Sequence, residues 1–347
     1  MLSATTILRS SSSYSRSSSI VLRSICGRRS VATTTAALAP SISTTSNATL
    51  TPRYQKLSSC KKYLTAYTNI GHRSSSTSSS SSEHFDHIVK SHFPGAISNT
   101  SLVESVKSIL STKGFTSDNT LLATSLCADE LARVLEDDFV KIYGNNFNLG
   151  GLSGFPFAGN TGFGAMAAHI PDNGYCLLVH GPHVGICQNG TIGKVERRGI
   201  ELVDNCCGSA IAASNYVKGI THGGADITMK LQQFTDFQQG AVQELILPFG
   251  KRLADAEANS ANGNREEGRM RELPYALYDS QELLVEEIVR KGAGGIKKGL
   301  AVLGGIQINT SPDTDDYFHP LKFDLYDENG KVARDLLPFL ATMQEKA

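Results

Sequence analysis

Cysteine and histidine, two residue types that hold zinc in proteins, gather in the middle of this 347-residue chain. They occur at three places, each at the end of a short apolar run or in a loop. Two thiolates and one imidazole make a mixed sulfur and nitrogen ligand set that suits Zn²⁺. The pattern therefore predicts a zinc site with one ligand from each place. The three places are Cys127, the pair His180 and His183, and the pair Cys206 and Cys207.

Cys127 lies at a predicted junction between a strand and a helix. The apolar run 120–126 predicts a short buried strand, and 129–143 predicts a helix with Asp129 and Glu130 in its first turn. The partly positive start of a helix lowers the pKa of a thiol, and α/β sheets bind ligands at the carboxyl ends of parallel strands. The position at a strand end, together with Asp129 two residues further on, favours Cys127 as a ligand over the alternative of an inert buried thiol.

One residue of each pair is better placed than the other. His183 lies farther beyond its predicted strand than His180 does, and Cys207 precedes Gly208, which permits close approach of the backbone. We therefore prefer His183 and Cys207. A structural histidine and a thiol that faces the core are the alternatives, and Cys187 is a nearby rival thiol.

The acid–base candidate is Asp129, which follows the first cysteine by two residues. A carboxylate beside a metal-bound water needs a fixed orientation, which an arginine can supply through two hydrogen bonds. Either Arg197 or Arg198 is expected to do this. The alternative is that both arginines lie on a solvated surface.

Strands and helices alternate along the chain, which predicts an α/β domain with a mainly parallel central sheet flanked by helices. Residues 254–271 predict an exposed, mobile loop, 312–323 another loop, and 332–342 a final amphipathic segment. Ser101 and Glu104 make a possible capping box. The predicted strands are 120–126, 175–179, 191–195 and 299–309, and the predicted helices are 102–110, 129–143, 163–169, 210–217, 227–247 and 280–291.

The first 82 residues differ in composition from the rest. They contain seven Arg, three Lys and long serine runs but no Asp or Glu, which is typical of an organellar transit peptide. Such a segment has too little apolar surface to fold, so we expect 1–82 to be a disordered leader and 83–347 to be the folded domain. The basic amphipathic start favours a mitochondrion over a plastid.

Composition excludes several classes of protein. Residues 83–347 contain 23 basic and all 33 acidic residues, a net charge of −10, which argues against a nucleic-acid surface. No apolar run approaches the roughly 18 residues of a membrane span. Seven widely spaced cysteines do not form a secreted disulfide scaffold.

The glycine-rich stretch 144–164 lacks the Lys-Ser/Thr ending of a phosphate-binding loop, and its aromatic residues favour an apolar pocket or a dimer contact.

Several stretches together resemble the algal limiting-CO2-inducible B/C family, also called theta carbonic anhydrase, whose fold is similar to that of beta carbonic anhydrase. The resemblance covers most of 85–340. The stretches are 127–130 (Cys-Ala-Asp-Glu), 144–157, 162–172, 183–186 (His-Val-Gly-Ile), 193–199 (Gly-Lys-Val-Glu-Arg-Arg-Gly) and 206–210 (Cys-Cys-Gly-Ser-Ala).

The resemblance implies a zinc site formed by Cys127, His183 and Cys207, with water or hydroxide in the open fourth position. It also implies that Asp129 pairs with an arginine, Arg197 or Arg198. The expected activity is a zinc-dependent carbonic anhydrase, in which zinc-bound hydroxide converts CO2 reversibly to bicarbonate and a proton. A homodimer is expected, and a hetero-oligomer with other family members is a further possibility.

Two other functions stay open at this point. Some members of the family lack anhydrase activity, so the chain could be a catalytically silent CO2- or bicarbonate-handling assembly protein with a structural zinc. A fourth protein ligand would favour that alternative, whereas three ligands plus water would favour the enzyme. A thiol redox protein that uses Cys206 and Cys207 is disfavoured, because no Cys-x-x-Cys motif accompanies them.

Overall fold

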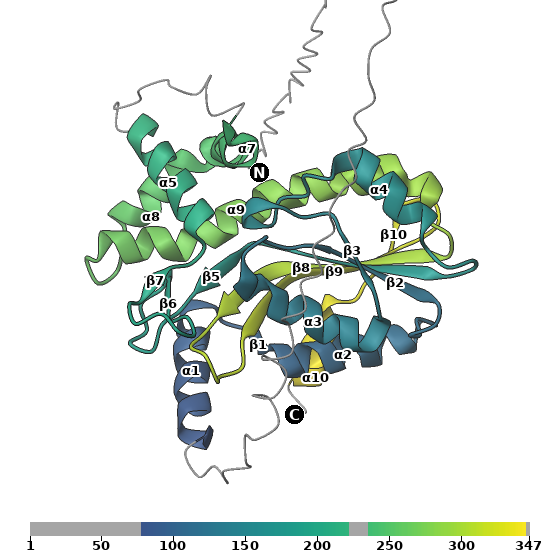
Figure 1. The fold of residues 1–347 in the computed structure, drawn as a ribbon, viewed down its shortest axis with the longest axis horizontal. Helices are drawn as coiled ribbons and strands as arrows, with labels where there is room; N and C mark the ends of the chain where they lie inside the picture. The colour runs from purple at the N-terminus through teal and green to yellow at the C-terminus, as the bar shows by residue number, and fades with distance from the viewer. Residues whose placement is uncertain (1–77, 222–234, 345–347) are drawn as a thin grey trace, which may run out of the picture. The chain divides into compact units, whose positions relative to one another are not determined.

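The computed structural model describes residues 78–221 and 235–344, with an eight-stranded β-sheet at their centre (Figure 1). The sheet strands are β1 (Ile97–Ser98), β2 (Thr120–Ser125), β3 (Asn146–Asn148), β4 (Tyr175–His180), β5 (His183–Gly185), β8 (Gly299–Asn309), β9 (Tyr317–Tyr326) and β10 (Val332–Asp335). They follow the order β1-β9-β8-β4-β2-β3, with β10 paired to β9 and β5 paired to β8. Strands β6 (Lys194–Val195) and β7 (Asp204–Asn205) form a separate two-stranded sheet.

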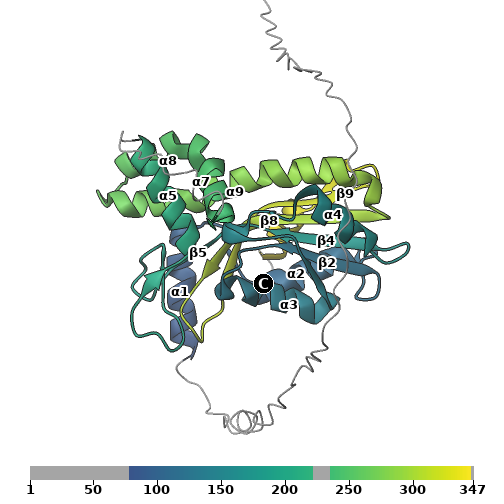
Figure 2. The ribbon, with the colours of Figure 1, turned by 45° about the horizontal axis from the view of Figure 1, so that its top comes forward.

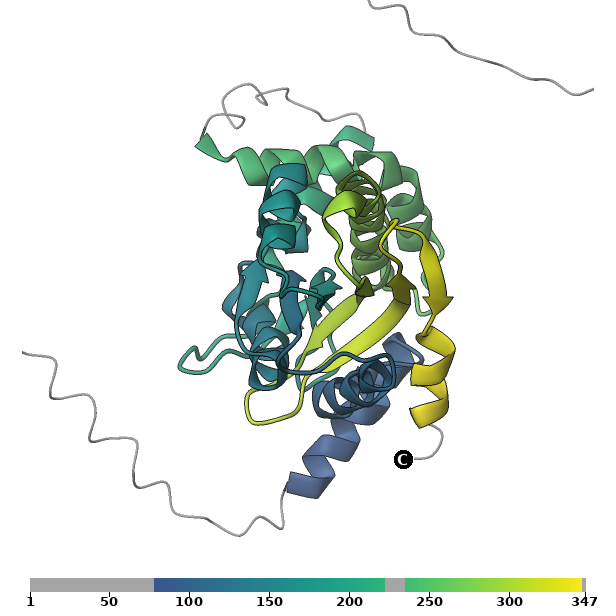
Figure 3. The same cartoon turned by 90° about the vertical axis from the view of Figure 1, so that its right-hand side faces the viewer.

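Helices cover both faces of the sheet (Figure 3). One face packs against α4 and the second half of α9, and the other against α2, α3 and α10. Helices α5, α7 and α8 gather against the first half of α9 (Figure 2). The helices are α1 (Ser78–His92), α2 (Asn99–Ser111), α3 (Arg133–Tyr143), α4 (Gly159–Ala168), α5 (Gly208–Thr221), α7 (Phe237–Ile246), α8 (Gly250–Ala258), α9 (Arg265–Gly292) and α10 (Leu337–Gln344). Within the described ranges, no helix combines the length and hydropathy of a membrane span.

The centre of the sheet is parallel, and this arrangement positions the site. Strand β4 is buried on both faces, because Leu177 and Val179 face one core while Cys176 and Leu178 face the other. It pairs in parallel with β2 and with β8, so Ser125 stands beside His180 at the carboxyl ends of two adjacent strands. The predicted α/β fold with a mainly parallel centre is confirmed, and in the eight-stranded sheet the antiparallel pairings are those of β9.

Two segments predicted to be loops contain regular structure. Residues 254–271 contain the end of α8 and the start of α9, whose N-cap Asn264 accepts a hydrogen bond from the backbone N–H of Glu267. The polar composition that suggested a loop includes charged side chains that these helices bury, Glu257 and Arg269. The second segment, 312–323, contains the start of strand β9, which the sequence did not predict because proline at position 320 disfavours a strand. Pro320 is tolerated there because it pairs with Gly305 at a bulge of the β8–β9 ladder.

Helix starts also differ from the predictions. The N-cap of α2 is Ser98, whose hydroxyl accepts from the N–H of Ser101, so Ser101 lies within the helix and forms no capping box with Glu104. The long predicted helix before Tyr143 begins as the short 3-10 helix η1 (Glu130–Ala132), and α3 follows it.

Parts of three predictions lie beyond the described residues. Most of the leader, 1–77, is outside them, whereas 78–82 belong to α1. The start of the predicted helix 227–247 is also outside, and its second half is α7. The last residues of the chain, 345–347, are outside as well.

Candidate metal centre

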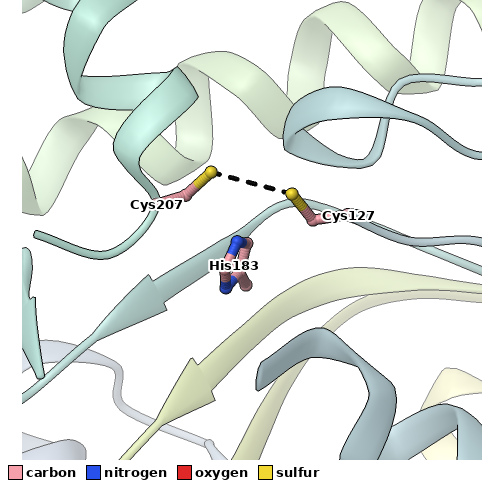
Figure 4. A group of neighbouring side chains, drawn as sticks. All are labelled: Cys127, His183 and Cys207. Atoms are coloured by element: carbon pink, nitrogen blue, oxygen red, sulfur yellow. Dashed lines mark hydrogen bonds between the residues drawn. The ribbon is translucent and has the colours of Figure 1, made fainter. Parts of the chain in front are cut away.

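Cys127, His183 and Cys207 meet at one point, where their ligand atoms lie within 4.8 Å of one another (Figure 4). All three side chains are buried. The two sulfur atoms are 3.7 Å apart. This is the only such group of acidic, cysteine and histidine residues in 78–221 and 235–344 that could hold a metal ion. The arrangement is the one that the resemblance implied.

Parallel strands bring the first two of these residues together. Cys127 follows β2 by two residues, and His183 opens β5, just after the end of the adjacent strand β4. Cys207 arrives from a distant part of the chain, immediately before α5. The three elements converge at the carboxyl edge of the sheet, which is where open α/β sheets bind their ligands.

The glycine-rich stretch folds closely over this edge. A Cβ on Gly150 would stand 2.3 Å from the carbonyl oxygen of Leu126, and a Cβ on Gly154 would stand 2.3 Å from that of Gly181. Gly154 also has a φ of +85°, which disfavours other residues. These glycines are therefore needed because backbone packs on backbone beside the cysteine and histidine. The segment also brings Ser153, whose hydroxyl oxygen lies 3.8 Å from the sulfur of Cys207.

His183 presents one ring nitrogen to the centre. Its Nδ1 lies 2.9 Å from Oδ1 of Asn309. Its Nε2 is buried and has no hydrogen-bond partner in the described part of the chain. Buried ring nitrogens without a partner are rare, because desolvation is then uncompensated. A metal ion bound at Nε2 would remove that cost, so the residues present fit a metal.

The two thiols interact directly. Their hydrogen bond lowers the pKa of Cys207 well below its ordinary value and raises the pKa of Cys127. Either sulfur can be the donor of this hydrogen bond, and the two shifts make Cys207 the more acidic thiol of the pair. A bound cation would displace the proton of this hydrogen bond, because thiolates and not thiols are the ligands of zinc.

Asp129 lies at the edge of the cluster. Its Oδ2 is 3.9 Å from Nε2 of His183 and 3.1 Å from Nη2 of Arg197. Its other oxygen, Oδ1, accepts from the backbone N–H of Leu131. Arg197 is held in turn by Glu130, whose Oε1 is 2.8 Å from Nε, and by the carbonyl oxygen of Asn205. The carboxylate is thus fixed from two sides, as an acid–base group beside a metal requires.

The structure separates the alternatives that the sequence left open. Arg198 points away and pairs with the exposed Asp313. The sulfur of Cys206 approaches Nδ1 of His183, at 3.4 Å, and not the nitrogen that faces the cluster. The thiol of Cys187 donates a hydrogen bond to Oδ1 of Asn189.

His180 lies elsewhere, on the α9 side of the sheet. It is fully buried, stacks on Tyr278, and has its Nε2 3.1 Å from a carboxylate oxygen of Glu282. Ser153 and Asn309 at the site were not expected, because their residue types carry no metal-binding signal.

Comparisons with known proteins identify the family of this chain. Residues 96–327 match the family model of the limiting CO2-inducible proteins B/C beta carbonic anhydrases. The crystal structure of PtLCIB4, a homolog of the limiting CO2-inducible protein LCIB, has 43% sequence identity and a TM-score of 0.65, over 72% of this chain and 98% of that one. A point mutant of PtLCIB4 gives 42% identity and a TM-score of 0.66, over 74% of this chain and 99% of that one.

A more distant structure has the same fold. The crystal structure of LCIB matches at 20% identity with a TM-score of 0.50, over 69% of this chain and 93% of that one. A comparison with curated protein sequences found no match. The family model spans well over half of the chain and the similarity to PtLCIB4 covers its folded part, so the chain belongs to the family of limiting CO2-inducible B/C beta carbonic anhydrases.

Proposed function

We propose that this protein is a zinc-dependent carbonic anhydrase, which interconverts CO2 and water with bicarbonate and a proton. The observation that carries the proposal is the carboxylate of Asp129, fixed by Arg197 and placed 3.9 Å from the free nitrogen of His183. A purely structural metal site needs no oriented acid–base group at its edge. Family membership supports the same activity.

The ligand set suits zinc with one open position. Cys127, His183 and Cys207 supply two sulfurs and one nitrogen, and catalytic zinc sites characteristically keep three protein ligands. A zinc ion held by these residues would lower the pKa of a bound water molecule to about 7 and would so supply hydroxide at neutral pH. Cys206 lies on the far side of the imidazole, which argues against a fourth protein ligand and against a silent protein with structural zinc.

Asp129 and Arg197 do the positioning in this proposal. Oδ2 of Asp129 accepts the hydrogen of the attacking oxygen, so that the lone pair of that oxygen points at the carbon of CO2. Arg197 prevents the carboxylate from rotating, because it donates to the same oxygen at 3.1 Å. The backbone N–H of Leu131 fixes the second oxygen.

Asp129→Ala tests this role directly. The variant is expected to bind zinc in the same stoichiometry as the parent, because Asp129 is not among the three ligands, yet to lose about 10²-fold or more in turnover. Metal content and stopped-flow CO2 hydration, measured on the same samples, separate the two effects. Loss of zinc together with activity would contradict the assignment, and so would full activity without the carboxylate.

The leader and the assembly extend the proposal. We infer from the composition of 1–82 that the chain is delivered to an organelle, with a mitochondrion favoured over a plastid. We also infer, from the resemblance to the beta carbonic anhydrase fold and from the aromatic residues of the glycine-rich stretch, that the folded domain acts as a homodimer. Imaging of a fluorescent fusion that retains the leader checks the first point, and sedimentation of the folded domain checks the second. Fluorescence throughout the cytosol, or a monomer at micromolar concentration, would count against the respective inference.

A further inference from the structure

We propose that Asn309, backed by Asp316, is a positioning residue of the metal centre that serves both halves of the site. Its side-chain amide sets the tautomer of His183 and also anchors the backbone segment that carries Asp129. The inference rests on the proposed zinc site, but it concerns residues that neither the ligand pattern nor the acid–base pair includes.

Asn309 can reach His183 because of the strand register. It is the last residue of β8, where it stands beside Gly185 in the parallel ladder with β5. His183, two residues earlier on β5, presents its side chain on the same face of the sheet. Since Gly185 has no side chain, the amide of Asn309 extends along the strand to the imidazole, and the two side chains meet at 2.9 Å. Both are 2% exposed.

The orientation of the amide is determined by its other partners. Nδ2 of Asn309 donates to Oδ2 of Asp316 at 2.9 Å and to the carbonyl oxygen of Leu131 at 3.1 Å. A carboxylate and a carbonyl only accept hydrogen bonds, so the NH2 group must face them and Oδ1 must face His183. The imidazole then has to donate from Nδ1. This leaves the lone pair on Nε2, the nitrogen that points at the cysteines, and that tautomer is the one required for a metal.

Asp316 is itself held in place. Its Oδ1 accepts from the backbone N–H of Thr310 at 2.8 Å, in the connection between β8 and β9. Its carboxyl group is mostly buried, and burial raises its pKa to about 6. A carboxylate in this position gives the amide a strong acceptor that does not exchange roles with water. The hydrogen bonds from His183 to Asn309 and from Asn309 to Asp316 therefore each have a fixed donor and a fixed acceptor. Together they leave the lone pair of His183 on Nε2.

The second hydrogen of the same amide acts on the other half of the site. The carbonyl of Leu131 accepts from Asn309, while the N–H of Leu131 donates to Oδ1 of Asp129. One residue of backbone thus links the amide to the carboxylate that Arg197 holds. Removing the amide is expected to loosen both His183 and the backbone segment that carries Asp129, because Asn309 is hydrogen-bonded to both sides of the site.

Asn309→Leu is the primary test, because leucine is of similar size but offers no hydrogen bond. The apparent zinc affinity of the full chain is measured by competition with a chromophoric chelator, and the Co²⁺-substituted protein is measured by its visible absorption spectrum. We expect affinity to fall about 10- to 100-fold and the Co²⁺ spectrum to change, as when supporting partners of metal ligands are lost elsewhere. The matched control is Asp313→Asn, an exposed carboxylate in the same β8–β9 connection, which should change neither.

A double variant distinguishes positioning from general destabilisation. Asn309→Leu leaves the buried carboxylate of Asp316 without its amide donor, which by itself destabilises the fold. Asn309→Leu with Asp316→Asn removes the buried charge and keeps a side-chain oxygen for the backbone N–H of Thr310. If the amide positions the ligands, the double variant regains thermal stability but keeps the low zinc affinity and the altered spectrum. Should Asn309→Leu not fold, Asp316→Asn takes its place, with a smaller loss of affinity expected.

Three results would overturn the inference. Wild-type affinity and spectrum in the folded Asn309→Leu protein, or in its replacement, contradict a positioning role. Recovery of both properties in the double variant shows that only an unpaired carboxylate mattered. A parent chain that binds no zinc overturns the zinc proposal and this inference together. If the parent binds zinc and Asn309→Leu binds it with the same affinity, only this inference is overturned.

Discussion

At the scale of single residues, the site depends on a division of roles between neighbouring side chains. Cys207 lies in the candidate metal centre and Cys206 does not, although they are adjacent. Arg197 holds Asp129, whereas Arg198 faces solvent and pairs with Asp313. Composition cannot separate such neighbours, because the choice depends on which side of the backbone faces the cluster. That information exists only once the chain is folded.

The two arginines provide a matched pair for a functional test. The side chain of Arg197 is 13% exposed and that of Arg198 is 82% exposed. Arg197→Ala frees the carboxylate of Asp129 to rotate, so we expect the second-order rate constant of CO2 hydration to fall about 10- to 100-fold with zinc retained. Arg198→Ala, a surface change, should stay within about twofold. Equal effects of the two substitutions would show that Asp129 does not depend on this partner.

At the scale of elements, close packing at the strand ends limits what the central strand β8 tolerates. A Cβ on Gly304 would stand 2.5 Å from Nε2 of His180 and 2.7 Å from the hydroxyl of Tyr278. These are ring and ring-bound atoms in a buried stack, so they cannot move aside easily. The glycine therefore leaves room for the histidine that precedes the ligand-bearing turn.

Gly304→Ala should destabilise the protein by about 1–3 kcal/mol, the usual cost of overpacking a core. The measurement is the free energy of unfolding in denaturant, taken with the metal removed so that binding does not contribute. Gly294→Ala is the matched control, because nothing lies within 4 Å of its added Cβ. An unchanged free energy for Gly304→Ala would mean that His180 and Tyr278 repack at no cost.

At the same scale, the limits of sequence reasoning are physical. The apolar runs that became β2, β4 and β8 were predicted nearly to the residue, because burial on both faces leaves a continuous hydrophobic signal. Strand β9 and the start of α9 were missed. The first contains Pro320 at a bulge, and the second is solvated on one side and capped by Asn264.

At the scale of the whole molecule, the site is made by topology. Cys127, His183 and Cys207 are far apart along the chain and meet because parallel strands end at one edge and α5 starts there. Residue types and spacing predicted the three places, and the family resemblance implied these three residues. Asn309 was not predictable, because its role depends on the β5–β8 register and on a carboxylate in a strand connection. Supporting residues of this kind have ordinary side chains, and only geometry identifies them.

The most direct test of the central claim is stopped-flow CO2 hydration by the zinc-loaded parent chain beside Cys127→Ser. The substitution replaces a thiolate ligand with a weakly coordinating hydroxyl of similar shape. A zinc-dependent anhydrase predicts clear activity in the parent, which is abolished by a chelator, restored by zinc, and absent from Cys127→Ser. A folded, zinc-containing parent that does not accelerate hydration would contradict the enzyme assignment and favour a silent member of the family.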